Sequence, residues 1–275
     1  MLPVRRVETT TGILLFIFQA FLIDKGITIV PLRKIFRLME PFDKSESAIR
    51  MGLSREVKNG LLINEKRNGE VYYGLNTVTA SGLQEWRVTF ERFRARISRQ
   101  TKPWDGIWTM VYSEERNTVE SILRDYSFGL LDRNTWLCPF NFTQSDLAIL
   151  KKQTQSIIIF QSQHAVGLTD RQIAERIWSV EKIALSYEEY LKNVNESYLK
   201  LQQQTDQGRA GLPFLHRFGL EIFELIQDDP QLPLALLPDN WQGLKAFQQF
   251  GSYRKEVLQK SEAFIFNILN DGKSE

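Results

Sequence analysis

Residues 43–60 read Asp-Lys-Ser-Glu-Ser-Ala-Ile-Arg-Met-Gly-Leu-Ser-Arg-Glu-Val-Lys-Asn-Gly, and they carry the signals of a complete, capped helix. Asp43 or Ser45 can accept the free amide hydrogens of the first turn, and Glu46 would complete a capping box with Asp43. Asn59-Gly60 supplies a left-handed exit. Apolar residues recur near the helical period between these caps and predict a buried face formed by Ala48, Ile49, Leu53 and Val57.

The opposite face of this helix is polar and basic. Residues spaced at i, i+3, i+4, i+7 and i+11 fall on one exposed stripe, which contains no acidic residue. The stripe consists of Ser47, Arg50, Met51, Ser54 and Lys58, with Arg55 on its shoulder. Arginine pairs with guanine edges, serine bonds bases or phosphates, and lysine adds charge toward a DNA backbone. A solvated helix face is the competing interpretation, but the next segment favours DNA contact.

Two strand patterns follow the helix. Leu61-Leu62-Ile63 and Val71-Tyr72-Tyr73-Gly74-Leu75 flank Asn68-Gly69, a strong hairpin signal because both residues tolerate the positive φ of a type I′ turn. The tip is basic, so the hairpin can reach phosphates or a minor groove. The predicted DNA contacts of the hairpin are Lys66, Arg67, Asn68 and Tyr72.

Two helical patterns precede the capped helix. The first runs from Thr10 or Thr11 to Asp24, and the second begins at Pro31 and ends at Pro41. The expected buried face of the second helix is Leu32, Ile35, Phe36 and Met39, and its expected outer face is Arg33, Lys34 and Arg37. Three helices followed by a basic hairpin predict a winged helix-turn-helix DNA-binding domain over residues 1–80.

The first helical pattern needs to be distinguished from a secretory signal. Arg5-Arg6 precedes an apolar run, but Gln19 interrupts the run and Asp24-Lys25-Gly26 follows it without a small-residue cleavage site. The run is also too short to span a bilayer. The sequence therefore predicts a buried first helix and no membrane association.

Charge is unevenly distributed along the 275 residues, although the net charge is only +2. Residues 1–102 hold 18 Lys and Arg against 10 Asp and Glu, a charge of +8, whereas the remainder holds 17 against 23, a charge of −6. A basic amino-terminal part fits a polyanionic partner.

Cys138 is the only cysteine, and His164 and His216 lack metal-like spacing. We therefore expect a cytoplasmic protein without disulfides, metal, cofactor or catalytic site.

The middle of the chain predicts a connector and a second domain. Residues 81–102 form a helical pattern in which Leu83, Trp86, Phe90, Phe93 and Ile97 are spaced like a short coiled-coil seam, so this helix packs on the DNA-binding domain, dimerises, or does both. Residues 103–165 contain strand patterns at 107–112, 129–131, 135–138 and 157–160 and helical patterns at 117–126 and 144–153. The order βαββαβ predicts a ferredoxin-like domain.

The remaining residues, 166–275, are predicted to be helical. Asp170 is expected to cap one helix, a loop contains Gly208 to Gly211, and helices follow from Pro213 to Gln227 and from Trp241 to Leu269. The predicted fold class is therefore α+β, with a carboxyl-terminal all-helical domain for effector binding or dimerisation. Its candidate effector contacts are Trp178, Tyr187, Arg217 and Trp241. Aromatic residues at helical spacing are core by default, so both interpretations remain open.

Three blocks of residues point to a known family. The first combines Ser47-Ala48-Ile49-Arg50, Leu53-Ser54-Arg55 and Gly60-Leu61-Leu62. The second combines Pro103-Trp104-Asp105-Gly106-Ile107-Trp108-Thr109, Phe128-Gly129 and Trp136. The third combines Asp229-Pro230-Gln231-Leu232-Pro233, Leu236-Leu237-Pro238 and Trp241-Gln242-Gly243. Together they span nearly the whole chain and resemble the PaaX family of transcriptional repressors, which control phenylacetic acid breakdown.

The resemblance implies a homodimer that binds a palindromic double-stranded DNA operator and is released by phenylacetyl-CoA or a related acyl-CoA. One stretch departs from the family pattern. Typical members carry a Glu-Tyr-Arg-Arg-like stretch before the Asp-Pro turn, whereas this chain has Glu221-Ile222-Phe223-Glu224. If those arginines hold a CoA phosphate, Glu224 would repel it. The departure concerns the effector and leaves the predicted DNA contacts unchanged.

Two alternatives remain. Ferredoxin-like domains also occur in metal-dependent nucleases with an aspartate at the end of the first strand. Here that strand ends in Val111-Tyr112-Ser113, and the nearest acids are Glu114 and Glu115. The other alternative is a regulator of unrelated genes with a different effector or none.

Overall fold

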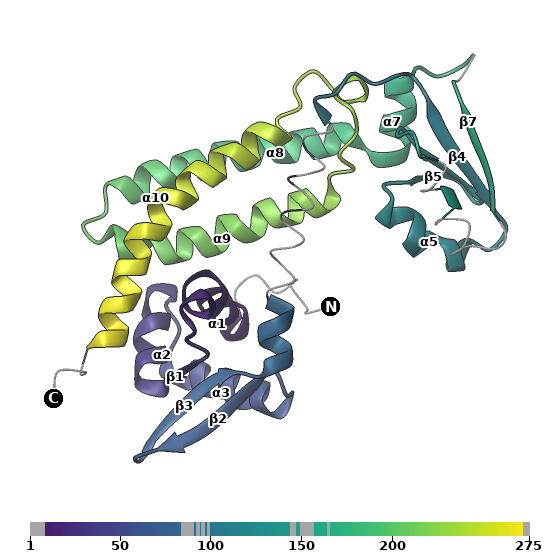
Figure 1. Ribbon diagram of the computed structural model, residues 1–275. Coiled ribbons are helices and arrows are strands. Elements are labelled where there is room, and N and C mark those ends of the chain that lie inside the picture. Colours follow the sequence, from purple (N-terminus) through teal and green to yellow (C-terminus); the bar gives the residue numbers. More distant parts are fainter. Residues whose placement is uncertain are drawn as a thin grey trace. The chain divides into compact units, whose positions relative to one another are not determined.

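The structure is a computed structural model that describes residues 9–83, 91, 94, 97, 100–143, 147–148, 157–163 and 166–271. These residues form helices and two antiparallel sheets, one of three strands and one of four (Figure 1). The chain divides into two compact units. The first comprises Met1–Arg92, Tyr190–Glu224 and Lys245–Glu275, and the second comprises Phe93–Glu189 and Leu225–Leu244.

The first unit begins with a helical segment that changes its hydrogen-bonding pattern twice. It starts as α1 (Thr10–Ile17), continues as a π-helix (Phe18–Leu22) and ends as a 3₁₀ turn (Ile23–Lys25). Gly26, at φ 72°, closes the segment. The predicted first helix is therefore present but is not a single α-helix.

The second helix, α2 (Leu32–Met39), is followed by a 3₁₀ turn (Glu40–Phe42). Its predicted faces were partly wrong, because Lys34, expected on the outer face, is only 7% exposed. The Lys34 ammonium donates a hydrogen bond to the carbonyl oxygen of Leu269, near the carboxyl end of α10 (Gly243–Asn270). The carboxyl end of a helix carries the negative end of its dipole, which stabilises a cation such as the Lys34 ammonium. The burial of Lys34 therefore depends on a residue that lies 235 positions later in the sequence. Ile35 and Met39 are buried as predicted, whereas Leu32 and Phe36 are half-buried.

The third helix, α3 (Glu46–Lys58), is capped by Ser45, whose hydroxyl oxygen accepts the amide hydrogen of Ala48 at 3.3 Å. The alternative cap, Asp43, lies in a left-handed turn at φ 52° and forms no capping box with Glu46. Gly60, at φ 72°, provides the predicted left-handed exit.

The hairpin has the predicted geometry. β2 (Leu62–Arg67) and β3 (Glu70–Leu75) pair in antiparallel fashion, and Asn68 and Gly69 both have positive φ, 48° and 83°. A short strand that the sequence did not predict, β1 (Ile29–Pro31), pairs with the other edge of β3, so the order is β1-β3-β2.

The first unit also contains most of three long helices, and each of the three has residues in the second unit as well. They are α8 (Val180–Gln202), α9 (Gln207–Asp228) and α10. The predicted loop over Gly208 to Gly211 was wrong, because these residues lie inside α9. A Cβ at Gly211 would lie 2.5 Å from the Ser261 hydroxyl oxygen, and one at Gly208 would lie 2.7 Å from the Lys260 carbonyl oxygen. The glycines therefore allow α9 and α10 to approach closely.

The second unit is built on a four-stranded sheet. Its strands and first helix are β4 (Trp108–Ser113), α5 (Arg116–Asp125), β5 (Gly129–Asp132), β6 (Thr135–Cys138) and β7 (Ile157–Ser162). The strand order is β5-β6-β4-β7, with each neighbouring pair antiparallel. A core that includes Val111, Leu123 and Trp136 joins α5 to the sheet. Most of the predicted helix at 144–153 and of the predicted connecting-helix seam lies outside the described residues.

Another core of the second unit joins the sheet to segments that come much later in the sequence. α7 (Asp170–Trp178), the start of α8 and a 3₁₀ turn (Leu234–Leu236) surround the sheet residues Trp108 and Leu137. α7 is capped by Thr169 rather than by the predicted Asp170, because the Thr169 and Gln172 side chains form a reciprocal capping box.

A buried histidine in the first unit predicts a dependence of stability on pH. His216 of α9 is 5% exposed, and its ring meets the rings of Phe16 and Phe42 edge to face at 5.2 and 5.7 Å. Burial, with a contribution from nearby Lys44, lowers the pKa of His216 from 6.5 to about 4. Between these values the unfolded chain binds the proton more readily, so this contribution to stability is complete above pH 6.5 and is lost as pH falls through about 4.

We therefore expect His216→Phe to remove a pH-dependent term of roughly 3 kcal/mol from the free energy of unfolding. Urea titrations of both proteins between pH 4 and pH 7 would measure it. The parent should lose more stability toward low pH than the variant does. Parallel pH profiles would contradict the expectation.

Candidate nucleic-acid interface

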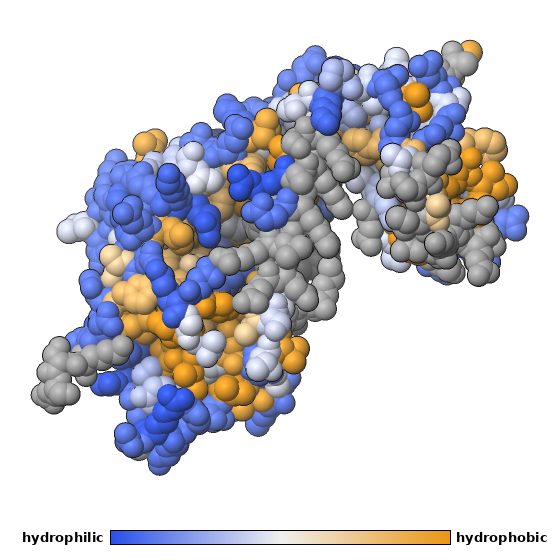
Figure 2. All heavy atoms as spheres, in the orientation of Figure 1, coloured by the Kyte–Doolittle hydropathy of each residue, from blue (hydrophilic) through white to orange (hydrophobic). Residues whose placement is uncertain are grey.

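The predicted DNA contacts lie on the surface of one helix and one hairpin. All of the predicted α3 side chains, Ser47, Arg50, Met51, Ser54, Arg55 and Lys58, are exposed. Lys66, Arg67 and Asn68 at the hairpin tip are exposed too, and Tyr72 is half-buried. The hairpin projects beyond the helices of its own unit, and its projecting end carries hydrophilic residues (Figures 1 and 2).

Hydrogen bonds fix the hairpin to the carboxyl end of α3. The Leu61 amide donates to the Glu56 carbonyl oxygen at 3.0 Å, and the Thr79 hydroxyl donates to the Leu61 carbonyl oxygen at 2.9 Å. The Asn76 side-chain amide donates to the Gly60 carbonyl oxygen. Hydrogen bonds therefore join the segments that flank the hairpin to the end of α3.

Arg50 is held in place on the exposed face. Its guanidinium lies 4.7 Å from the centre of the Phe36 ring on α2, and its Nη2 atom is 3.7 Å from a Glu46 carboxylate oxygen. The expectation of a stripe free of acid was incomplete, since Glu46 lies one turn before Arg50 and is exposed. The i, i+4 spacing of the two residues is the sequence signal for this pair. The stacking restricts the orientations that Arg50 can take.

Glu56 is a buried carboxylate that connects α3 to α1. It accepts hydrogen bonds from Arg55 at 2.8 Å, from Thr11 at 2.9 Å and from Asn59 at 3.1 Å. Burial alone would raise the pKa of Glu56, but the hydrogen bonds from Arg55, Asn59 and Thr11 outweigh it and lower the pKa. Arg55 is therefore partly occupied by a structural ion pair, although its side chain remains exposed.

The other cations differ in how far they are neutralised. Within the described residues, Lys58 and Lys66 have no carboxylate within ion-pair distance. Arg67 pairs with Glu65 and lies 5.1 Å from the centre of the Tyr72 ring. Lys58 and Lys66 therefore bring uncompensated positive charge to this surface.

Three of the four candidate effector contacts lie in the second unit, two of them together. The hydroxyl of the buried Tyr187 donates to Asp229 at 2.9 Å, and its ring meets Trp241 edge to face at 5.4 Å. Burial raises the pKa of Asp229 to about 6, and burial beside Asp229 raises that of Tyr187. Trp178 stacks on Trp108 with ring centres 6.3 Å apart. These contacts belong to a packed core.

Arg217, the fourth candidate, lies in the first unit. It pairs with Glu221 at 2.9 Å and lines a groove of about 280 Å³ with Lys200, Phe214 and Phe218. A second groove of about 380 Å³ shares Gln204, Ala210 and Pro213 with it.

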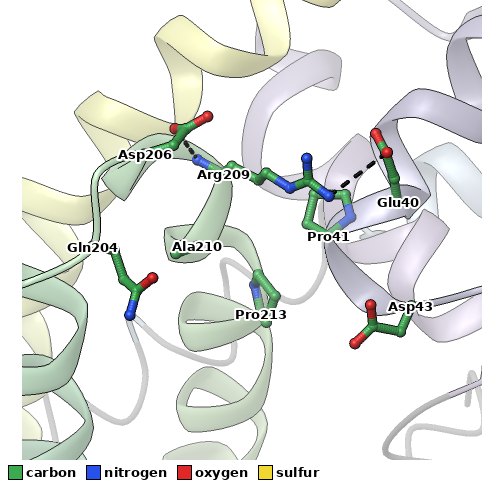
Figure 3. Close-up of a pocket in the computed structure, with 8 residues that line it drawn as sticks. All are labelled: Glu40, Pro41, Asp43, Gln204, Asp206, Arg209, Ala210 and Pro213. Carbon is green, nitrogen blue, oxygen red and sulfur yellow. Dashed lines mark hydrogen bonds and ion pairs between the residues drawn. The ribbon is translucent and has the colours of Figure 1, made fainter.

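The second groove is acidic. Glu40, Asp43 and Asp206 line it together with Arg209, whose guanidinium is 3.7 Å from Glu40 and whose amide donates to Asp206 at 2.9 Å (Figure 3). Three carboxylates against one guanidinium disfavour an anionic ligand in this groove.

The acids of the nuclease alternative are exposed. Glu114 and Glu115 follow β4 directly, and the Tyr112 hydroxyl lies 3.5 Å from Glu114. In the described part of the chain, no three His, Cys, Asp or Glu side chains gather as metal ligands would. None of the described helices combines the length and the apolar character needed to cross a membrane.

Comparisons with known proteins identify the family. Residues 11–78 match the family described as "PaaX-like protein", and residues 178–267 match the "PaaX-like protein C-terminal domain". The matches cover more than half of the 275 residues, and the chain belongs to the PaaX-like family. The resemblance inferred from the three residue blocks is thus confirmed. Family membership supports a transcriptional regulator of the PaaX type.

A solved structure has a similar fold. The uncharacterized protein Rv0674 from Mycobacterium tuberculosis superposes with a TM-score of 0.55 over 93% of this chain and 98% of that chain, at 17% sequence identity. At this identity the similarity concerns the fold alone. None of the curated protein sequences compared with the chain matches it.

Proposed function

We propose that the protein is a homodimeric, sequence-specific DNA-binding repressor. The observation that carries the proposal is the exposure of every predicted α3 contact on a helix that is fixed to a basic hairpin. In this proposal α1, α2, α3 and the β1-β3-β2 sheet act as a winged helix-turn-helix, and the β5-β6-β4-β7 sheet belongs to a ferredoxin-like domain.

Each side chain has a role that follows from its chemistry. Arg50, Ser47 and Ser54 read base edges in the major groove, while Lys58 and Lys66 hold phosphates. Arg55, Arg67, Asn68 and Tyr72 supply further contacts on the same surface. A dimer of this type prefers half-sites about one helical turn, roughly 10 base pairs, apart or a multiple of that distance.

The proposed target is an operon for breakdown of a phenylacetate-type aromatic acid. An aryl- or acyl-CoA effector would release the repressor from the operator of that operon. The groove beside Arg217 suits such an effector better than the other candidates do, because two cations, Arg217 and Lys200, line it together with Phe214 and Phe218. Tyr187, Trp178 and Trp241 contribute to a packed core in the second unit. The acidic groove of Figure 3 repels CoA phosphates.

The test is fluorescence anisotropy of the protein on labelled duplexes tiled across its own upstream region. Tight binding to one tile, lost when phenylacetyl-CoA is added but not when coenzyme A alone is added, is the expected result. Arg217→Ala should raise the thioester concentration needed for release about tenfold, the loss of one charge-assisted contact. Specific binding that no acyl-CoA thioester changes would contradict the effector and retain the regulator.

A further inference from the structure

The DNA-facing stripe of α3 contains one apolar side chain, Met51, which is 69% exposed. Exposure of one apolar residue is not unusual in itself, and Leu199 of α8, in the same unit, is 63% exposed. The position of Met51 on α3 is what distinguishes it.

Met51 lies near the middle of the exposed face of α3. The buried face is formed by Ile49, Gly52, Leu53 and Glu56. With about 100° of rotation per residue, Met51 projects within roughly 30° of the direction opposite the centre of that face. If α3 enters the major groove of DNA, the Met51 side chain therefore lies close to the base edges at the floor of that groove.

Hydrogen-bonding side chains surround Met51. Ser47 lies one turn before it, Ser54 and Arg55 lie one turn after it, and the exposed Arg50 projects about 100° to one side. A thymine presents an acceptor oxygen and a C5 methyl group side by side in the major groove, and the methyl group is the apolar feature there. The unbranched methionine side chain adapts readily to such a contact.

We propose that Met51 contacts the C5 methyl group of a thymine in the operator and thereby selects an A·T pair at that position. The inference rests on the proposed DNA-reading role of α3 and adds the base that the helix selects. Arg50 and Ser54 then supply hydrogen bonds around an apolar contact, so specificity comes from both kinds of interaction.

The experiment uses the full chain and a duplex that it binds specifically. Each thymine is replaced in turn by deoxyuridine, which removes the methyl group and keeps base pairing, at the symmetric positions of both half-sites. One replacement should weaken binding about fourfold per half-site, which corresponds to about 0.8 kcal/mol. Met51→Ala should weaken binding to the thymine duplex by a similar factor. The affinity of this variant should be the same for the thymine and the deoxyuridine duplexes.

Two further variants make the result specific. Met51→Leu keeps an apolar side chain and should retain the response to deoxyuridine, whereas Leu199→Ala, at a similarly exposed site outside α3, should behave like the parent. The proposal is overturned if no replacement of thymine by deoxyuridine changes the affinity of the parent protein. It is also overturned if such a replacement weakens binding of Met51→Ala as much as it weakens binding of the parent. Absence of specific binding to any duplex would instead contradict the proposed function.

Discussion

Arg50→Ala is expected to reduce the preference for operator over unrelated DNA by about 30-fold or more, because a dimer loses about 1 to 3 kcal/mol of base discrimination in each half-site. Arg50 is suited to this role by its place on the exposed face of α3. Stacking over Phe36 at 4.7 Å holds the guanidinium before DNA arrives, so less side-chain entropy is lost on binding. Competition anisotropy with operator and scrambled duplexes measures the ratio.

Lys66→Ala is the matched control, since it removes a cation that has no ion-pair partner among the described residues. It should weaken binding to all duplexes alike and reduce the slope of log affinity against log salt by about 1 per protomer. If Arg50→Ala leaves the operator preference intact, or if Lys66→Ala alters that preference as strongly, the assigned roles are wrong.

Gly74→Ala is expected to destabilise the first unit by about 1 to 3 kcal/mol, since the added atom has no space. A Cβ at Gly74 would lie 2.4 Å from the Thr28 carbonyl oxygen and 3.0 Å from the Ile29 Cα. Backbone atoms cannot rotate away as a side chain can, so β1 must separate from β3. This movement strains the hydrogen bond from the Leu75 amide to the Thr28 carbonyl oxygen, which is 3.0 Å long.

Urea titration measures this loss, and Gly251→Ala is its control. Gly251 lies in α10, has no neighbouring atom within 4 Å of an added Cβ, and does not have positive φ. Alanine there should leave stability unchanged or raise it by up to about 1 kcal/mol through helix propensity. Equal unfolding midpoints for the two variants would show that the close approach of β1 and β3 does not contribute to stability.

The elements that the sequence predicted well are specified by neighbouring residues. The exit of α3 at Gly60 and the hairpin turn at Asn68 and Gly69 depend on local φ preferences. The exposed stripe was predictable for the same reason, because helical spacing fixes which side chains share a face. The choice between Asp43 and Ser45 as the cap was not predictable, because both side chains suit the role and the preceding 3₁₀ turn decides between them.

The features that the sequence missed depend on distant partners. Lys34 is buried where a carbonyl oxygen near the carboxyl end of α10 accepts a hydrogen bond from its ammonium group. Gly208 lies inside α9 at a point where α10 passes so close that a Cβ would have no space. Phe36 lies below Arg50 because α2 packs beside α3. Charge and periodicity within one segment contain no information about such contacts.

Two of the three residue blocks that indicated the family form structural contacts in the second unit. Trp104 and Trp108 meet edge to face at 5.3 Å, and Leu232 and Trp241 pack in the same core. Asp229 accepts the Gln231 amide at 2.6 Å as well as the Tyr187 hydroxyl. These contacts give the blocks a role in packing, so the blocks identify the fold without locating an effector.

Selection from a library of random duplexes at about 150 mM salt, where non-specific phosphate contacts are weakened, tests the central claim most directly. The proposed reading of DNA by α3 predicts enrichment of a palindromic sequence whose half-sites are about 10 base pairs, or a multiple of that, apart. The same selection with Arg50→Ala should give a shorter or more degenerate sequence. Uniform recovery of the library with the parent protein would contradict the claim.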